Sequence, residues 1–178
     1  MVRALGVSLL LLAVTVTASA QQRARVDPGA REVLDYRLSP EALRRVESVM
    51  RAMDGVPSRG PEAPRADVAM ITVLQSSLAY GQVWRDATVD ETVRTTERGH
   101  HELAGAVRAA GLSQREYVLA VMNLLLAYPV AAQRRQGRAV AVSDVAAENV
   151  AWVEANFADV ERFMRELGQR IAAARGGR

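Results

Sequence analysis

The sequence contains no cysteine and no lysine, and it has only two histidines among 178 residues. Without cysteine the chain forms no disulfide, no thiolate metal site and no c-type haem attachment, so packing alone must hold the fold. Alternation typical of a β-strand is confined to residues 139–142, whereas apolar residues elsewhere recur at helical spacing. These absences predict an all-α protein that is stabilised by its hydrophobic core.

Because lysine is missing, arginine supplies every basic side chain, 23 of them against 20 acidic residues. A GC-rich genome that favours arginine codons explains this choice. The arginines are scattered along the chain and interleaved with acids. Nucleic-acid binding requires a concentrated basic face with aromatic side chains among the arginines. We therefore expect no nucleic-acid partner.

The first 20 residues have the three parts of a secretory signal peptide. Arg3 gives a positive start, residues 5–16 form an apolar run, and Ala18-Ser19-Ala20 supplies the small residues of a cleavage site. The apolar run is shorter than the ~20 residues that a membrane-spanning helix needs. We therefore expect cleavage after Ala20 and export to the periplasm or the medium, with no transmembrane helix in the mature form. No cysteine follows the small residues, which excludes a lipoprotein anchor.

Removal of the first 20 of 178 residues leaves 158, a length that suits one domain. We expect residues 21–37 to be a flexible lead-in because they are polar and mixed. Residues 38–175 are expected to form a single helical bundle of four to five helices.

The first two helices are predicted from cap residues and from the prolines and glycines that separate them. Ser39 suits an N-cap and Pro40 the first helical position, so a helix is expected over residues 40–54. Three prolines and two glycines in residues 55–64 exclude a helix there. A second helix is expected to begin near Asp67.

Two capping boxes mark the next two helices. Thr88 with Glu91 predicts a helix over residues 89–110, and Ser113 with Glu116 predicts another that begins at residue 114. Gly111 between them is a natural left-handed C-terminal residue. These signals agree on a tight turn between two helices.

The helix expected over residues 114–133 is apolar nearly all round, which is typical of a central helix in a bundle. Pro129 is expected to kink it or to end its regular part. A last helix is expected over residues 144–174. Its apolar side chains repeat at alternating steps of three and four, which is a coiled-coil pattern and predicts a homodimer through residues 150–171; they are Val150, Val153, Phe157, Val160, Met164, Leu167 and Ile171.

Few residues suit catalysis or metal binding. His100 and His101 are adjacent and point about 100° apart on a helix, so they cannot clamp one metal ion. A ferritin-like site needs a Glu-x-x-His pair on each of two helices, and Glu97 with His100 supplies that spacing once. We assign no catalytic residue, no metal site and no cofactor. A haem held by His100 and a core methionine stays open as an alternative.

Several polar residues are candidates for contact with a ligand or partner. Asn123 is the one polar residue deep in the apolar helix, where it either orients a ligand or fixes the register of the bundle. Arg134, Arg135 and Arg138 form a cluster that can grip an anion or an acidic partner, although a solvated loop is the more common role of such a run.

Two motifs resemble a group of uncharacterised exported bacterial proteins. In that group a Gly-Leu-Thr/Ser-x-Arg-Glu-Tyr corner precedes an apolar helix, as in residues 111–118 here, and a Glu-Asn-Val-x-Phe/Trp-Val helix ends the chain, as in residues 148–156. The resemblance covers roughly residues 36–170 and implies no known activity. It directs attention to Arg115, Glu116, Tyr117, Glu148, Asn149 and Trp152.

Glu148, Asn149 and Trp152 complete the candidate contact residues, which also include His100, Asn123 and the three arginines. The sequence as a whole predicts an exported helical binding or interaction protein without catalytic machinery, whose partner is a protein or a small apolar ligand. The alternative is an envelope haem- or ligand-binding bundle, or a small helical enzyme that uses His100 and arginines.

Overall fold

The computed structural model describes residues 31–56, 67–71, 74, 86–140 and 146–176. The predicted signal peptide, residues 21–30 and the expected start of the last helix at residue 144 lie outside this part. Within it every regular element is an α-helix, which confirms the all-α prediction.

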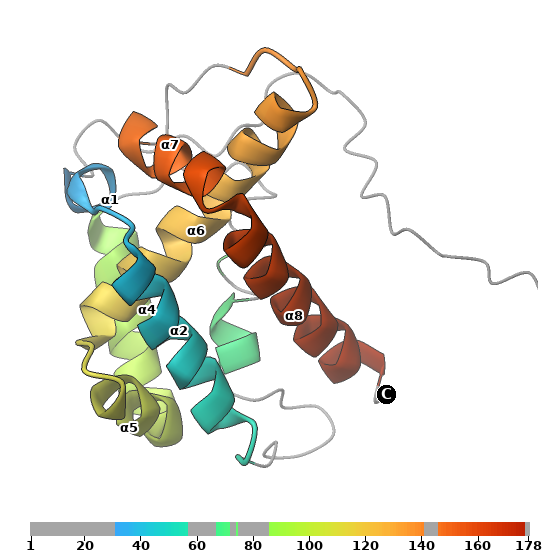
Figure 1. Ribbon diagram of the computed structural model, residues 1–178. Coiled ribbons are helices and arrows are strands. Elements are labelled where there is room, and N and C mark those ends of the chain that lie inside the picture. The colour runs from blue at the N-terminus through green and yellow to red at the C-terminus, as the bar shows by residue number, and fades with distance from the viewer. Residues whose placement is uncertain (1–30, 57–66, 72–73, 75–85, 141–145, 177–178) are drawn as a thin grey trace, which may run out of the picture.

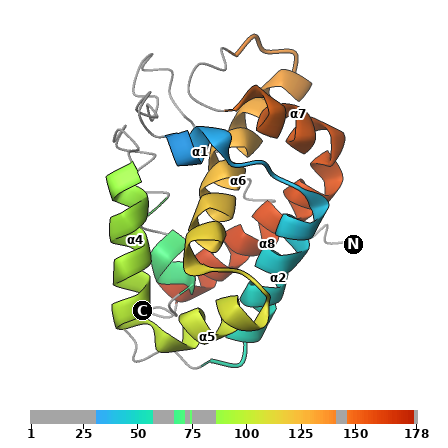
Figure 2. The same ribbon diagram turned by 90° about the vertical axis from the view of Figure 1, so that its left-hand side faces the viewer.

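The labelled helices pack around one long central helix, α6 (Figures 1 and 2). Residues 67–71 and 74, coloured green to teal in Figure 1, are helical as well, which agrees with a second helix near Asp67. The bounds are α1 Arg31–Asp35, α2 Pro40–Met53, α4 Asp86–Gly99, α5 His101–Ala109, α6 Gln114–Arg135, α7 Ala147–Ala155 and α8 Phe157–Gly176.

Helix α6 contacts α1, α2, α4, α5, α7 and α8. In Figure 2 it runs between α4 and α2, with α5 across one end. By length and hydropathy α6 is suited to cross a membrane, but 67% of its apolar stretch is buried inside the protein. This is the position expected for a central bundle helix. The helix continues through Pro129 to Arg135, so the proline does not end it.

Helix α2 begins as its sequence indicates. The Ser39 hydroxyl accepts a hydrogen bond from the backbone N–H of Ala42 at 3.1 Å, and Pro40 occupies the first turn. Leu38 and Leu43, on either side of this cap, are both buried. The cap and this apolar pair fix the direction in which the chain enters α2.

The corner between α5 and α6 is also formed as predicted. Gly111 has φ +74°, and the N–H groups of Gly111 and Leu112 donate to the carbonyls of Arg108 and Val107 at 3.0 and 3.1 Å. This pair of bonds is a Schellman motif. The capping box of Ser113 follows directly, so two helix ends share one turn.

Three boundaries differ from the sequence prediction, and the first is the lead-in. Residues 31–35 form helix α1 rather than a flexible segment, and Val33 is buried in the core. Arg115 of α6 donates to Glu32 at 2.6 Å. One apolar anchor and one ion pair thus order a segment whose polar composition gave no such signal.

The second difference lies in the helix expected over residues 89–110. Helix α4 already includes Asp86, so Thr88 lies inside it and not at a cap, and the chain leaves helical geometry at His100 (φ −140°, ψ 67°). Gly99 has low helix propensity, and the Thr96 hydroxyl donates to the Thr92 carbonyl at 2.8 Å. These weak helix formers let the chain turn and start α5 as a separate helix.

The third difference lies in the helix expected over residues 144–174, which breaks at Asn156 (φ −112°, ψ 29°). The Asn156 amide donates to the Trp152 carbonyl at 2.8 Å, so this side chain competes with the regular helix ladder. Five residues of the predicted dimer stripe are buried within this chain, whereas Phe157 and Met164 are half-buried. The stripe is therefore the inner face of α7 and α8, and pairing of two chains through it stays a prediction.

Alanine at two glycines should have opposite effects on stability. Gly111→Ala forces a Cβ into left-handed backbone and should lower the free energy of unfolding by about 1–2 kcal/mol. Gly105→Ala, inside α5 with nothing within 4 Å of the added Cβ, should raise it by up to about 1 kcal/mol. Urea denaturation followed by circular dichroism measures both, and an equal effect at the two sites would contradict the assigned corner.

The capping box should also make stability depend on pH. Hydrogen bonds from the backbone N–H and the hydroxyl of Ser113 lower the pKa of Glu116 below its ordinary 4.5. The ionised carboxylate therefore stabilises the fold fully above pH 4.5, and this contribution disappears as the pH falls through the lowered value. Glu116→Gln keeps a capping acceptor but cannot titrate.

We expect the stability difference between the native protein and Glu116→Gln to be largest near pH 7 and to shrink below pH 4.5. Denaturant titrations from pH 7 to 3 measure it. Glu91→Gln, on the exposed face of α4, controls for the loss of an acid outside a cap. A difference that does not change with pH would show that the charge of Glu116 has no role.

Candidate functional site

The structure brings the candidate residues of the sequence together in two places. Asn123, Glu148 and Asn149 meet where α7 begins, beside the segment between α1 and α2. Arg134 and Arg135 lie in the last turn of α6, and Arg138 follows that helix. His100 is separate from both groups, at the start of α5.

Asn123 and Asn149, here called the buried amide pair, are each 1% exposed. The Asn149 amide nitrogen donates to the Asn123 side-chain oxygen at 2.7 Å and to the Tyr36 carbonyl at 2.8 Å. Its oxygen accepts from the Leu38 N–H at 2.9 Å, while the Asn123 amide donates to the Leu119 carbonyl at 3.0 Å. The pair thus joins α6, α7 and the α1–α2 segment, which supports the register role expected of Asn123.

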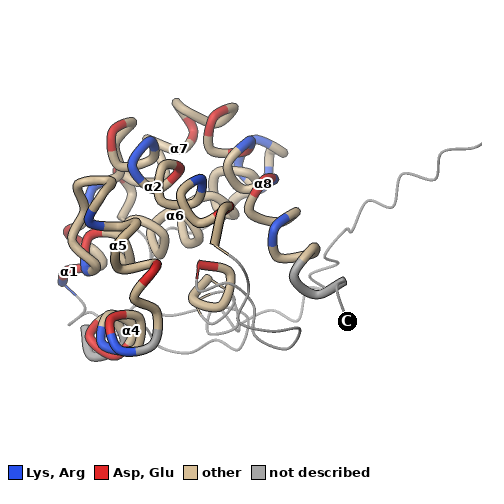
Figure 3. Tube along the Cα trace, turned by 90° about the horizontal axis from the view of Figure 1, so that it is seen from below, with Lys and Arg blue, Asp and Glu red and all other residues tan. Residues whose placement is uncertain are grey.

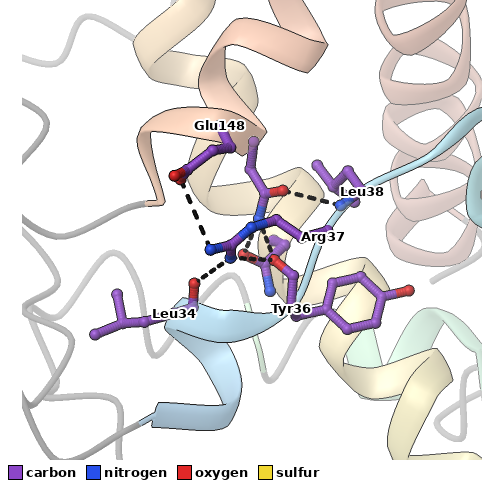
Figure 4. Close-up of polar contacts among 7 residues, drawn as sticks. Leu34, Tyr36, Arg37, Leu38 and Glu148 are labelled. Carbon is purple, nitrogen blue, oxygen red and sulfur yellow. Dashed lines mark hydrogen bonds and ion pairs between the residues drawn. The ribbon is translucent and has the colours of Figure 1, made fainter.

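Glu148 lies at the exposed edge of this pair. Figure 4 shows Arg37 directed toward Glu148, with 3.9 Å between their charged atoms, and toward the Leu34 carbonyl at 2.6 Å. Both charged side chains are at least half exposed, so their ion pair contributes little. The buried amides hold the α1–α2 segment in place, and the ion pair of Arg37 and Glu148 lies at its exposed edge.

The residues of the 111–118 motif have structural contacts. Arg115 donates to Glu32 of α1 and to Asp90 of α4, each at 2.6 Å, and these hydrogen bonds raise the pKa of its guanidinium. Glu116 belongs to the capping box. Burial raises the pKa of the Tyr117 hydroxyl, assisted by the charge of Asp67 and opposed by that of Arg170. The motif therefore orients helices around the start of α6.

A second buried polar region lies one turn into α6. The hydroxyl of Tyr117 and both amide atoms of Gln114 have no hydrogen-bond partner in the part of the chain that the structure describes. These residues are three positions apart and hence neighbours on one helix face. Buried groups of this kind commonly bind an ordered water molecule.

One of the three arginines, Arg135, contacts a pair of stacked aromatic rings at the opposite end of α6. The Tyr128 and Phe157 rings stack with centroids 5.7 Å apart and an angle of 22° between planes. The Arg135 guanidinium lies 4.4 Å from the centre of the Phe157 ring. We call Tyr128, Arg135 and Phe157 the arginine–aromatic cluster. Both rings are half-buried and Arg135 is exposed, so the cluster forms part of the surface.

Charged residues of both signs surround the cluster. Arg134 lies 3.6 Å from Glu154, and Arg165 lies 3.9 Å from Glu161. Burial raises the pKa of Tyr128, with a further rise from the negative charge of Glu161. Figure 3 marks arginines and acids along the same helices of the described chain, without a long stretch of one sign. The surroundings of the cluster thus carry charges of both signs and are not uniformly basic.

A groove of about 180 Å³ lies between α2 and α8. Two of its arginines have partners on or just after α2, since Arg162 lies 3.6 Å from Glu47, and Arg170 donates to Asp54 and to the Met50 carbonyl. Sites for small molecules usually enclose ~300–1,000 Å³ and are mostly apolar. The groove is smaller, and five of its seven lining residues are charged.

The two remaining candidates have local roles. His100 is half-buried at the break between α4 and α5, and its carbonyl accepts from Ala104 at 3.0 Å. Trp152 is half-buried on α7, one turn after Asn149. Among the described residues, no three His, Asp or Glu side chains lie close enough together to hold a metal ion.

Sequence reasoning selected the arginines but missed their aromatic partners. Tyr128 follows a long apolar run and Phe157 falls on the predicted dimer stripe, so both suggested core positions. Tyr128 and Arg135 are seven residues apart, two helical turns on one face. That spacing was the available signal, whereas Phe157 comes from α8, the helix that begins directly after the break at Asn156.

Removal of the Asn149 side chain should strongly destabilise the protein. Asn149→Ala leaves the Leu38 N–H, the Tyr36 carbonyl and the Asn123 amide oxygen without this buried partner. Each unsatisfied buried group costs roughly 1–3 kcal/mol, so we expect a loss of about 3–5 kcal/mol. Chemical denaturation at neutral pH measures it.

Asn156→Ala is the matched control because its amide makes one local bond, to the Trp152 carbonyl. We expect this variant to lose no more than about 1 kcal/mol. Equal losses for the two variants would show that the buried amide pair does not hold the α1–α2 segment in place.

Comparison with known proteins adds no further assignment. No protein-family model matches the sequence, and neither a curated protein nor a solved structure matches it. The resemblance carried by residues 111–118 and 148–156 therefore stays a prediction from those motifs. Any function must be argued from the contacts and surfaces of this chain itself.

Proposed function

We propose that this protein is exported through a cleavable signal peptide and acts outside the cytoplasm as a helical interaction protein without catalytic machinery. The proposal rests on where the polar residues of this chain make their contacts. The amides of Asn123 and Asn149 make their hydrogen bonds within the chain, whereas the arginine–aromatic cluster lies at the surface.

A protein partner suits this surface better than a small apolar ligand. Tyrosine and arginine are enriched at the energetically dominant positions of protein interfaces, and the cluster combines both types with a phenylalanine ring. The groove between α2 and α8, in contrast, is small and is lined by Glu47, Arg51, Arg162, Glu166 and Arg170 together with two apolar residues. That lining does not favour an apolar ligand.

The export half of the proposal is supported by the order of residues at the N-terminus. A positive residue, a short apolar run and the small residues Ala18 and Ala20 follow one another as export machinery requires. The absence of cysteine fits either side of the membrane, and it leaves stability to the core around α6.

Intact and native mass spectrometry of protein purified from the envelope of its own host tests both halves. We expect a polypeptide that begins at Gln21 and carries no stoichiometric metal. The absorbance spectrum of the same sample should show no Soret band. A chain that retains residues 1–20 would contradict export with cleavage. A bound haem or metal that is lost in His100→Ala would overturn the interaction proposal in favour of the alternative that uses His100.

A further inference from the structure

We propose that the arginine–aromatic cluster binds an acidic segment of a partner protein, in which a carboxylate side chain lies next to an apolar one. This inference rests on the proposed function and specifies its partner class. It is carried by the stacked rings of Tyr128 and Phe157, the guanidinium of Arg135, and the charges that flank them.

The rings provide the apolar part of the surface. Tyr128 and Phe157 come from α6 and α8, are half-buried, and are fixed against each other by stacking. Ordered rings lose little conformational entropy on binding, which makes aromatic side chains effective anchors in interfaces. An apolar side chain of a partner can remove their exposed portions from water.

Arg135 supplies the polar part. Its guanidinium lies over the Phe157 ring at 4.4 Å from the centre. A guanidinium that stacks on a ring still presents N–H donors along its edge, and the fork of these donors matches a carboxylate. The stack therefore orients Arg135 for an acidic side chain that lies next to the rings.

The flanking charges favour an acidic partner. Glu154 pairs with Arg134, and Glu161 pairs with Arg165. Arg135 and Arg138 are exposed and have no carboxylate partner within residues 31–56, 67–71, 74, 86–140 and 146–176. These two arginines give the cluster and its flanking charged residues, together called the patch, an excess of positive charge with which a partner carboxylate can pair.

A protein segment fits this charge pattern better than an anionic membrane does. Glu154 and Glu161 lie among the arginines of the patch, and a uniformly negative bilayer would repel both. A polypeptide can place its carboxylates beside Arg135 and keep neutral or basic groups beside the two glutamates. Interfaces of this kind derive specificity from complementary charge patterns.

Fluorescence anisotropy with a defined probe tests the inference on the full mature chain. The probe is a fluorescein-labelled peptide of repeated Asp-Phe-Glu-Leu units, and the matched peptide carries Asn and Gln in place of its acids. We expect the acidic peptide to bind, its affinity to fall with added salt, and the neutral peptide to bind at least about tenfold more weakly.

The paired variant Arg135→Gln with Arg138→Gln should weaken binding of the acidic peptide by about tenfold or more. Arg44→Gln with Arg108→Gln removes the same charge from exposed positions on α2 and α5 and should leave the affinity unchanged. Phe157→Leu keeps an apolar side chain but removes the ring beneath Arg135, and it should also weaken binding. Circular dichroism of each variant reports whether the fold is retained.

Three results would overturn the inference. The first is the absence of binding up to about 1 mM peptide, the weak limit of a useful affinity. The second is an equal loss in both arginine pairs, which would indicate attraction by net charge alone. The third is binding to phosphatidylglycerol vesicles that the Arg135 and Arg138 variant abolishes, with no peptide binding, because that would make the patch a membrane contact.

Failure of this inference and failure of the proposed function give different results. A partner that remains with envelope-purified protein equally in the native chain and in the Arg135 and Arg138 variant would overturn the inference and leave the interaction role intact. A stoichiometric haem or metal on the native chain would overturn the interaction role itself.

Discussion

The burial of α6 is the constraint on which the rest of the structure depends. Every residue from Tyr117 to Ala127 is buried, including leucine, valine and methionine side chains that each contribute about 1.5–3 kcal/mol when removed from water. A helix that is apolar nearly all round cannot present a polar face to solvent. The other described helices therefore surround it, and without cysteine no covalent link shares this task.

A core built around one apolar helix does not by itself fix the positions of the neighbouring helices, because hydrophobic contacts alone allow them to slide or rotate. The buried amide pair fixes these positions. Asn123 is buried in the middle of α6, and an unsatisfied amide there would be costly. Asn149 of α7 satisfies it only in one register and at the same time holds the backbone at Tyr36 and Leu38. One polar contact thus sets the positions of α7 and of the segment that leads into α2.

Local signals in the sequence predicted the parts of this fold that depend on local chemistry. The Ser39 cap, the Gly111 corner and the Ser113–Glu116 capping box involve residues within a few positions of one another, and each has formed. The breaks at His100 and Asn156 were missed because apolar spacing continues across both. Helix α1 was missed for a different reason, since its anchor Arg115 lies 83 residues away along the chain.

The candidate site follows the same division between local and distant contacts. The sequence identified Arg135 by composition and Phe157 by apolar periodicity, but it assigned them to a loop and to a dimer seam. The break at Asn156 changes the direction of the chain between Val153 and Val160, which stay buried, and Phe157 comes to lie beside Tyr128 at the surface. Phe157 is the first residue of α8, three positions before Val160, and it is half-buried where Val160 is fully buried. The break that the sequence prediction missed therefore lies directly before the aromatic ring that supports Arg135 in the proposed binding surface.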